Sequence, residues 1–216
     1  MEVYIRDATA DDADFIAWAI LTAARGNLTK PSVWDLAMPV AEQEKLKLLS
    51  ALSVAEPPCA AHFSGFVIAE NEAGEPLSAA CGFVPKEKPP EAFTEALLGV
   101  VEQAGWDQAQ QMALMSSFTV FAKCLPMNNE DVWVLEYIAT KPEARGTGAT
   151  FELLSDLLEC GRDYEMSDAN VAYFVGNDAA KNIYRKLGFT ESHELLDKEF
   201  EAQFGVAGVV HMKLAL

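Results

Sequence analysis

A short turn that contains two glycines, between an apolar segment and an amphipathic one, constrains the fold of this chain more than any other feature. Residues 132–140 are mainly apolar and have the length of a buried β-strand. After the turn at residues 145–150, the leucines of residues 153–158 recur with the period of an α-helix. A strand, a tight turn and a helix that packs back on a sheet together indicate an α/β architecture.

The same alternation of strand-like and helix-like segments continues along the chain. The predicted strands are residues 3–6, 63–70, 76–84, 132–140, 170–175, 189–196 and 206–214. The predicted helices are residues 11–25, residues 31–53 with a break at Pro39, two parts of 85–131 separated at Gly105, the stretch through 153–158, and residues 178–187. A length of 216 residues suits one domain. We therefore expect a mixed α/β sheet with helices on its faces, in a single domain of residues 1–216.

Charge and cysteine placement exclude several classes of protein. Lys plus Arg number 16 and Asp plus Glu number 33, and the resulting net charge of −17 repels nucleic acids and anionic membranes. No apolar run has the length of a membrane span, and the first residues lack a secretion signal. The four cysteines form no CxxC pair, and only three histidines are present. We expect a cytoplasmic protein with reduced cysteines and no metal, nucleic-acid or membrane partner.

The glycine turn itself, Arg145-Gly146-Thr147-Gly148-Ala149-Thr150, has the chemistry of an anion cradle. The first amides of a helix have no internal partner, and the helix dipole adds partial positive charge there. Glycines let the backbone approach a bulky anion closely. A tight turn that only packs on the sheet is the alternative. The dinucleotide fingerprint does not fit, because Phe151 replaces its third glycine, and no Gly-Lys-Ser or Gly-Lys-Thr follows for a nucleoside-triphosphate loop.

A second motif follows the next predicted strand, with the pattern Asn177-x-x-Ala180-x-x-x-Tyr184-x-x-x-Gly188-Phe189. Asn177 can cap the helix. Ala180 and Tyr184 are four residues apart, so they share one face of it, and the small side chain leaves room for a ligand beside the tyrosine. The alternative is a capped helix with a half-buried tyrosine.

In this order the two motifs resemble the GNAT superfamily of acetyl-CoA-dependent N-acetyltransferases. The stretch Ile138-Ala139-Thr140-Lys141-Pro142-Glu143-Ala144-Arg145-Gly146-Thr147-Gly148-Ala149 looks like that family's fourth strand and pyrophosphate loop. The resemblance implies a mostly antiparallel central sheet flanked by helices, with residues 85–131 as a helical insertion before the fourth strand. Thr150 departs from the Gly or Ala usual in the family, and we expect the loop to tolerate this small residue.

The resemblance also implies which residues bind acetyl-CoA. Backbone groups where the strand separates from its neighbour would hold the pantetheine arm, and the loop amides would hold the pyrophosphate. The implied cofactor-binding residues are Ile138, Ala139, Thr140, Arg145, Gly146, Thr147, Gly148, Ala149, Thr150, Phe151, Asn177, Ala180 and Tyr184. Arg145, Lys181 and Arg185 are available for the remaining phosphates, and each of them can equally be an ordinary solvated side chain.

Two residues are the candidate catalytic groups. Tyr184 occupies the family position that protonates the leaving thiolate. Glu136 is the candidate base, because Leu135-Glu136-Tyr137 looks like the corresponding strand of polyamine acetyltransferases. Alternation along the strand predicts that Glu136 shares a face with Ile138. A solvated or ion-paired carboxylate is the alternative reading of Glu136. Glu70 is the second candidate for the base, and the base position of another family branch is Ala172 here, which lacks a carboxylate.

The implied reaction is acetyl transfer from acetyl-CoA to a primary amine of a small, cationic acceptor by direct attack in a ternary complex. We expect the acceptor between the loop after the first helix, with Arg25, Asn27, Trp34 and Asp35, and the last hairpin, with its acidic residues 194–201. Two other functions stay open: a silent acyl-CoA-binding or regulatory module, and an acyltransferase for another acyl group or acceptor. The sequence also leaves a homodimer open.

Overall fold

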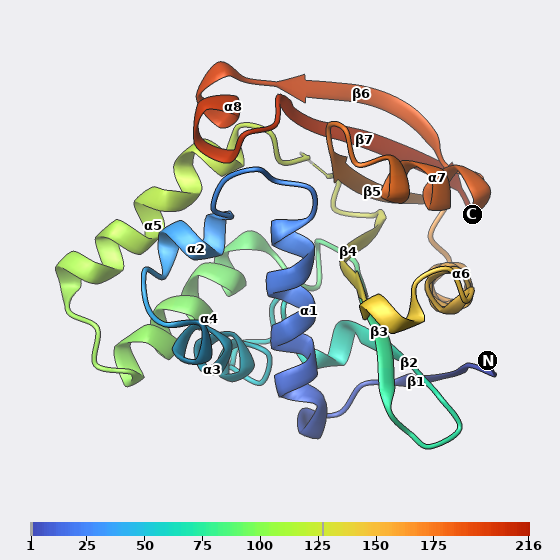
Figure 1. The fold of residues 1–216 in the computed structure, drawn as a ribbon, viewed down its shortest axis with the longest axis horizontal. Helices are drawn as coiled ribbons and strands as arrows, with labels where there is room; N and C mark the ends of the chain where they lie inside the picture. The colour runs from blue at the N-terminus through green and yellow to red at the C-terminus, as the bar shows by residue number, and fades with distance from the viewer. Residues whose placement is uncertain (1, 127) are drawn as a thin grey trace.

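The computed structural model describes residues 2–126 and 128–216, and its described strands form one seven-stranded open sheet (Figure 1). The strands are β1 (Tyr4–Asp7), β2 (Phe66–Glu70), β3 (Pro76–Phe83), β4 (Trp133–Thr140), β5 (Asp168–Phe174), β6 (Thr190–Leu196) and β7 (Gly208–Ala215). Their order is β1-β2-β3-β4-β5-β7-β6. The β4–β5 pair is parallel and the other described pairs are antiparallel, so the predicted mixed, mostly antiparallel sheet is confirmed.

Helices cover both faces of this sheet and bury a hydrophobic core on each. The helices are α1 (Ala13–Arg25), α2 (Val33–Ala37), α3 (Glu42–Leu52), α4 (Pro90–Gln103), α5 (Gln108–Ala122), α6 (Ala149–Asp163), α7 (Asp178–Lys186) and α8 (Lys198–Phe204). Helices α1 to α5 and α8 pack on one face and enclose what we term the larger core. Helices α6 and α7 cover the other face and enclose the smaller core. No helix of the described part of the chain combines the length and apolar character that crossing a membrane requires.

The predicted insertion, residues 85–131, contains two helices as expected. They are α4 and α5, and they separate at Gly105, which has a φ of 84° that favours glycine. Met127 of this segment lies outside the described residues. Phe93 of α4 and Phe118 of α5 both pack on Trp34, with ring centroids 6.0 and 5.3 Å from it, so the insertion completes the larger core.

One helix was missed by the sequence analysis, which expected only the last hairpin here, with its acidic residues 194–201. The Asp197 side chain accepts hydrogen bonds from the amides of Glu199 and Phe200 at 2.8 and 2.9 Å, and so caps α8. Phe200 and Phe204 are four residues apart and fully buried in the larger core. An Asp followed by two aromatics at helical spacing was the signal for this helix.

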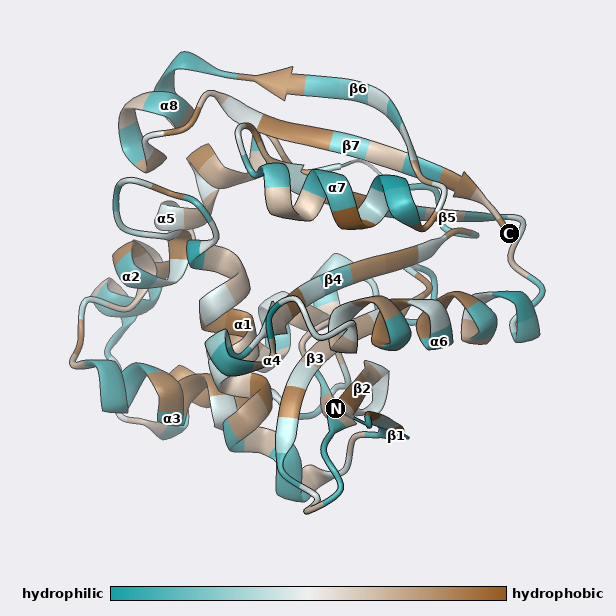
Figure 2. Ribbon diagram, turned by 45° about the vertical axis from the view of Figure 1, so that its right-hand side comes forward, coloured by the Kyte–Doolittle hydropathy of each residue, from teal (hydrophilic) through white to brown (hydrophobic). Residues whose placement is uncertain are grey.

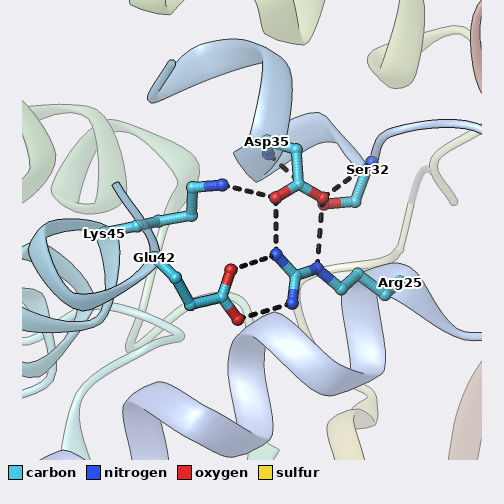
Figure 3. A network of polar contacts seen from close by, with 5 residues as sticks. All are labelled: Arg25, Ser32, Asp35, Glu42 and Lys45. Carbon is cyan, nitrogen blue, oxygen red and sulfur yellow. Dashed lines mark hydrogen bonds and ion pairs between the residues drawn. The ribbon is translucent and has the colours of Figure 1, made fainter. Parts of the chain in front are cut away.

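An ion-pair network joins α1, α2 and α3, three of the helices that enclose the larger core (Figure 3). The Arg25 guanidinium donates to Asp35 at 2.8 Å and to Glu42 at 2.7 Å, and Lys45 also bonds Asp35. Burial alone would raise the pKa of Asp35, but hydrogen bonds from Arg25, Lys45 and Ser32 outweigh it and hold that pKa well below its ordinary value. The residues proposed from sequence as an acceptor rim, Arg25 and Asp35, are therefore paired with each other. Trp34 is a core residue that is 2% exposed.

We expect Asp35→Asn to lower the free energy of unfolding by about 2–4 kcal/mol, because it leaves the Lys45 ammonium, which is 6% exposed, without its counter-ion. Urea unfolding at pH 7 measures this. Glu42→Gln is the control: Glu42 is 54% exposed, so its loss should cost about 1 kcal/mol or less. The lowered pKa of Asp35 means that its contribution is present above about pH 4 and is lost at lower pH. The difference between wild type and Asp35→Asn should therefore shrink in acid, and a difference that grows there would contradict this account.

Candidate active site

The candidate site begins where β4 and β5 separate. Their parallel pairing consists of three residue pairs, Trp133 with Ala169, Val134 with Asn170, and Leu135 with Val171. Beyond Leu135, β4 continues to Thr140 and β5 to Phe174 without further pairing, and the two strands diverge toward the start of α6 (Figure 2). The edge of β4 that faces β5 therefore has no strand partner at residues 138–140, the segment that the sequence analysis assigned to the pantetheine arm.

A β-bulge lies at the point of separation. Across the β3–β4 ladder, Ala79 pairs with Ala139 and Cys81 pairs with Glu136, so β4 contains one more residue than β3 in this interval. Tyr137 takes up the extra residue with a φ of 53°, in the left-handed region. The described residues contain one other non-glycine residue with a positive φ, Glu165.

The bulge changes which face each side chain of β4 occupies. Glu136 lies directly opposite Cys81, which belongs to the larger core, so Glu136 is on that face. Tyr137 packs on the larger core as well, whereas Ile138 packs on the smaller core. The prediction that Glu136 and Ile138 share a face is therefore wrong, because simple alternation does not hold through a bulge.

Glu136 is a half-buried carboxylate in surroundings that disfavour its charge. Burial raises its pKa to about 7, and no hydrogen bond or opposite charge among the described residues counteracts this shift. Its neighbour across the ladder is the buried Cys81 thiol, whose own pKa burial also raises. A carboxylate with a pKa near neutrality is suited to accept a proton at physiological pH.

Glu70, the second candidate for the base, is in a different situation. Its carboxylate accepts a hydrogen bond from Arg6 Nε at 2.7 Å, at the end of β2. The Glu70 carboxylate is therefore engaged in an ion pair, whereas the Glu136 carboxylate has no partner among the described residues. Glu136 is thus the more suitable of the two carboxylates.

The glycine turn forms an open cradle at the start of α6. Gly146 and Gly148 have φ values of 78° and 98°, and a Cβ atom at either position would meet nothing within 4 Å. Among the described residues, the amides of Gly146, Gly148 and Thr150 have no hydrogen-bond acceptor, whereas the Phe151 amide donates to the Gly148 carbonyl at 2.8 Å. Free amides at a helix N-terminus suit an anion such as a pyrophosphate.

Thr150 has a role that the sequence analysis missed. Its hydroxyl lies 2.7 Å from the Thr140 hydroxyl, which in turn lies 2.7 Å from Ser78 Oγ. Ser78 Oγ also donates to the Ala139 carbonyl at 2.8 Å. This chain of hydroxyls ties the first turn of α6 to the ends of β3 and β4. The residue that departs from the family pattern therefore fixes the cradle against the separated strand.

The second motif forms the start and the buried face of α7. The Asn177 side chain accepts from the Ala180 amide at 3.1 Å, so the predicted cap is confirmed. Tyr184 is 5% exposed and packs between Tyr173 and Phe189, with centroid distances of 6.2 Å to each. Its hydroxyl has no hydrogen-bond partner among the described residues, and burial raises its pKa well above the ordinary value. Tyr184 is therefore a neutral donor on the smaller-core side of the sheet.

The basic residues expected to be free for phosphates are engaged. Lys181 and Arg185 bind the Glu191 carboxylate at 3.0 and 3.1 Å, and Tyr173 donates to the same group. Arg145 Nε donates to the Thr140 carbonyl at 3.3 Å. Lys181 and Arg185, which the sequence left as either phosphate ligands or solvated side chains, are thus ion-paired with Glu191 of β6.

Comparisons with known proteins bear on this arrangement. Residues 117–189 match the model of the acetyltransferase (GNAT) family. No curated protein matches the chain. One similar solved structure is an acetyltransferase, with a TM-score of 0.71, 19% sequence identity and 98% of each chain covered. A second is an N-acetyltransferase from Staphylococcus aureus Mu50, with a TM-score of 0.68, 18% identity, and 98% of this chain and 100% of that chain covered. A third is a phosphinothricin acetyltransferase from Sinorhizobium meliloti in complex with AcCoA, with a TM-score of 0.55, 16% identity, and 100% of this chain and 89% of that chain covered.

The family match includes both the glycine turn and the Asn177–Phe189 motif. At these identities the solved structures show the fold, and they share it over nearly the whole chain. Residues 117–189 thus match the acetyltransferase (GNAT) family, as the resemblance implied, and the chain as a whole shares the fold of these solved acetyltransferases.

Proposed function

We propose that this protein transfers the acetyl group of acetyl-CoA to the primary amine of a small, cationic acceptor. The arrangement along β4 is the observation that carries the proposal. Glu136, whose carboxylate has no partner among the described residues, lies where β4 separates from β5. The free amides of the glycine turn follow the C-terminal end of β4. The glycine turn, as an anion-binding cradle, and Glu136, as a proton acceptor, thus lie at opposite ends of the segment of β4 that does not pair with β5.

The cradle has the chemistry that acetyl-CoA requires. In the proposal, the amides of Gly146, Gly148 and Thr150 bind the pyrophosphate, and the unpaired edge at Ile138 and Ala139 hydrogen-bonds the pantetheine arm. The phosphinothricin acetyltransferase of the same fold was solved with AcCoA. Bound acetyl-CoA supplies the thioester, whose carbonyl carbon the amine attacks.

The two candidate catalytic groups lie on opposite faces of the sheet. An alkyl amine has a pKa of about 10.4, so on the order of one molecule in a thousand is neutral at pH 7. We propose that Glu136 removes the ammonium proton on the larger-core face, directly or through water. We propose that Tyr184 donates a proton to the leaving thiolate on the smaller-core face. In the proposal, a ligand bound between β4 and β5 is reached by Glu136 from the larger-core face and by Tyr184 from the smaller-core face.

A cationic acceptor is the class that this site favours. The carboxylate of Glu136 has no counter-ion among the described residues, and the protein carries a net charge of −17. We further propose a cytoplasmic location, which the four free cysteines support.

Acetyl-CoA should raise the Tm of the wild type by about 5 °C or more at 100 times its Kd, whereas NAD and ATP should not. Gly146→Ala should weaken acetyl-CoA binding about tenfold or more, because the added methyl group projects into the space before the free amides. Gly74→Ala is the matched control: Gly74 has a φ of 75° against 78° for Gly146, and its Cβ also meets nothing, but it lies in the β2–β3 turn. Equal loss of binding in both variants would contradict the cradle.

Tyr184→Phe should lower kcat on the order of 100-fold and leave acetyl-CoA binding nearly unchanged, because the ring still packs and only the proton donor is lost. Thiol release at saturating acetyl-CoA measures kcat, and a thermal shift measures binding. Tyr164→Phe, which changes a tyrosine that is 52% exposed, should behave as the wild type. An unchanged kcat in Tyr184→Phe would show that the tyrosine is structural or that thiolate departure is not limiting.

For Glu136 the expected signature is in the pH dependence. The plot of wild-type kcat/KM against pH should rise and level off near pH 7, where Glu136 loses its proton. Glu136→Gln should lack this change of slope and should lose most of its activity at neutral pH. The loss should shrink as pH rises and free amine becomes abundant. Parallel profiles for the two proteins would exclude Glu136 as the base, and Glu70→Gln would then be tested in the same way.

Stability provides an independent check on the same variant. The folded-state pKa of Glu136 is raised, so its ionisation costs stability as pH rises from about 4.5 to 7, by up to about 3 kcal/mol. Glu136→Gln should therefore be more stable than the wild type at pH 8 and not at pH 4. A variant that is destabilised at pH 8 would identify a structural carboxylate.

A further inference from the structure

The backbone at Tyr137 is held in a conformation that disfavours its own side chain. A φ of 53° costs a bulky residue roughly 1–3 kcal/mol, and glycine would avoid that cost. The residue at this position of the bulge is nevertheless a tyrosine and not a glycine. Strained residues of this kind cluster at active sites, ligand clamps and switch regions.

The bulge points that side chain to the larger-core face, which is also the face of the adjacent Glu136. The Tyr137 ring stacks on Phe66 of β2, with centroids 6.0 Å apart and planes 15° apart. Phe66 itself is 2% exposed, so the tyrosine ring rests on a rigid surface. The orientation of the ring is therefore fixed before any ligand binds.

The polar tip of Tyr137 is not used within the protein. Among the described residues its hydroxyl has no hydrogen-bond partner, and burial together with the nearby Glu136 charge raises its pKa well above the ordinary value. The hydroxyl is therefore neutral at physiological pH. Glu136 and Tyr137 thus direct oxygen atoms, which have no partners among the described residues, to the same side of the sheet, and Glu136 directly follows the last residue of β4 that pairs with β5.

We propose that Tyr137 is a positioning residue for the acceptor, whose ammonium or amine nitrogen donates one hydrogen bond to the Tyr137 hydroxyl and another to Glu136. A primary ammonium carries three donors and no acceptor, so it can satisfy both oxygens at once. A tertiary ammonium has one N–H and can satisfy only one of them. The inference rests on the proposed function, and it adds that the site selects primary amines through a pair of oxygens from adjacent residues.

The test compares Tyr137→Phe, which keeps the ring on Phe66 and removes the hydroxyl, with Tyr4→Phe, a control at a tyrosine that is 46% exposed on β1. The probe amines are n-butylamine and 1,4-diaminobutane, with thiol release measured at saturating acetyl-CoA. Tyr137→Phe should raise the KM for amine about tenfold, which corresponds to about 1.4 kcal/mol, and leave kcat and the KM for acetyl-CoA unchanged. Tyr4→Phe should match the wild type.

Inhibition by N,N-dimethylbutylamine provides a second measurement that does not depend on turnover of the inhibitor. The wild type should bind n-butylamine more tightly than the dimethylated amine, and Tyr137→Phe should reduce that preference about tenfold. An unchanged KM and an unchanged preference in Tyr137→Phe would overturn the role of Tyr137 while the proposed function stands. A wild type that binds acetyl-CoA but neither acetylates nor binds any amine would instead overturn the proposed function, and this inference with it.

Discussion

The extra residue in β4 is the constraint on which the site depends. If β4 had one residue fewer between Glu136 and Ala139, Ala79 and Cys81 would pair with it in simple alternation. The bulge adds local twist, and the parallel ladder to β5 stops at Leu135, next to the bulge. The same feature turns Tyr137 toward the larger core beside Glu136. One inserted residue thus lies where the two strands separate and places Glu136 and Tyr137 on the same face of the sheet.

The sequence predicted most of the fold because its signals are local. The glycine turn, the Asn177 cap and the break at Gly105 each depend on the conformational preference of a few neighbouring residues, and all three occur in the structure. The face of Ile138 was wrong, because a bulge is set by pairing with β3, which periodicity does not report. Helix α8 was missed because its seven residues are too few for a periodic pattern.

Charged side chains were the part of the site that sequence described least well. The sequence placed Arg25 and Asp35 beside the acceptor. It left Lys181 and Arg185 as phosphate ligands or solvated side chains. In the structure each of the four has an ion-pair partner on another element. By contrast, Glu136 stayed available because the residues packed around it are apolar or neutral. Which charge is paired and which is isolated depends on tertiary contacts, which a sequence pattern does not report.

The three pairs between β4 and β5 also divide the sheet mechanically into two parts, β1 to β4 and β5 to β7, joined by a short seam. The insertion bridges that seam on the larger-core face. Phe118 of α5 packs on Trp34 of α2, while Phe121, three residues later, packs on Phe174 of β5 and on Phe200 of α8. Helix α5 thus shares one hydrophobic core with residues of both parts of the sheet, such as Val134 of β4 and Val209 of β7. The two half-sheets are therefore joined by side-chain packing on the larger-core face as well as by the three backbone pairs of the seam.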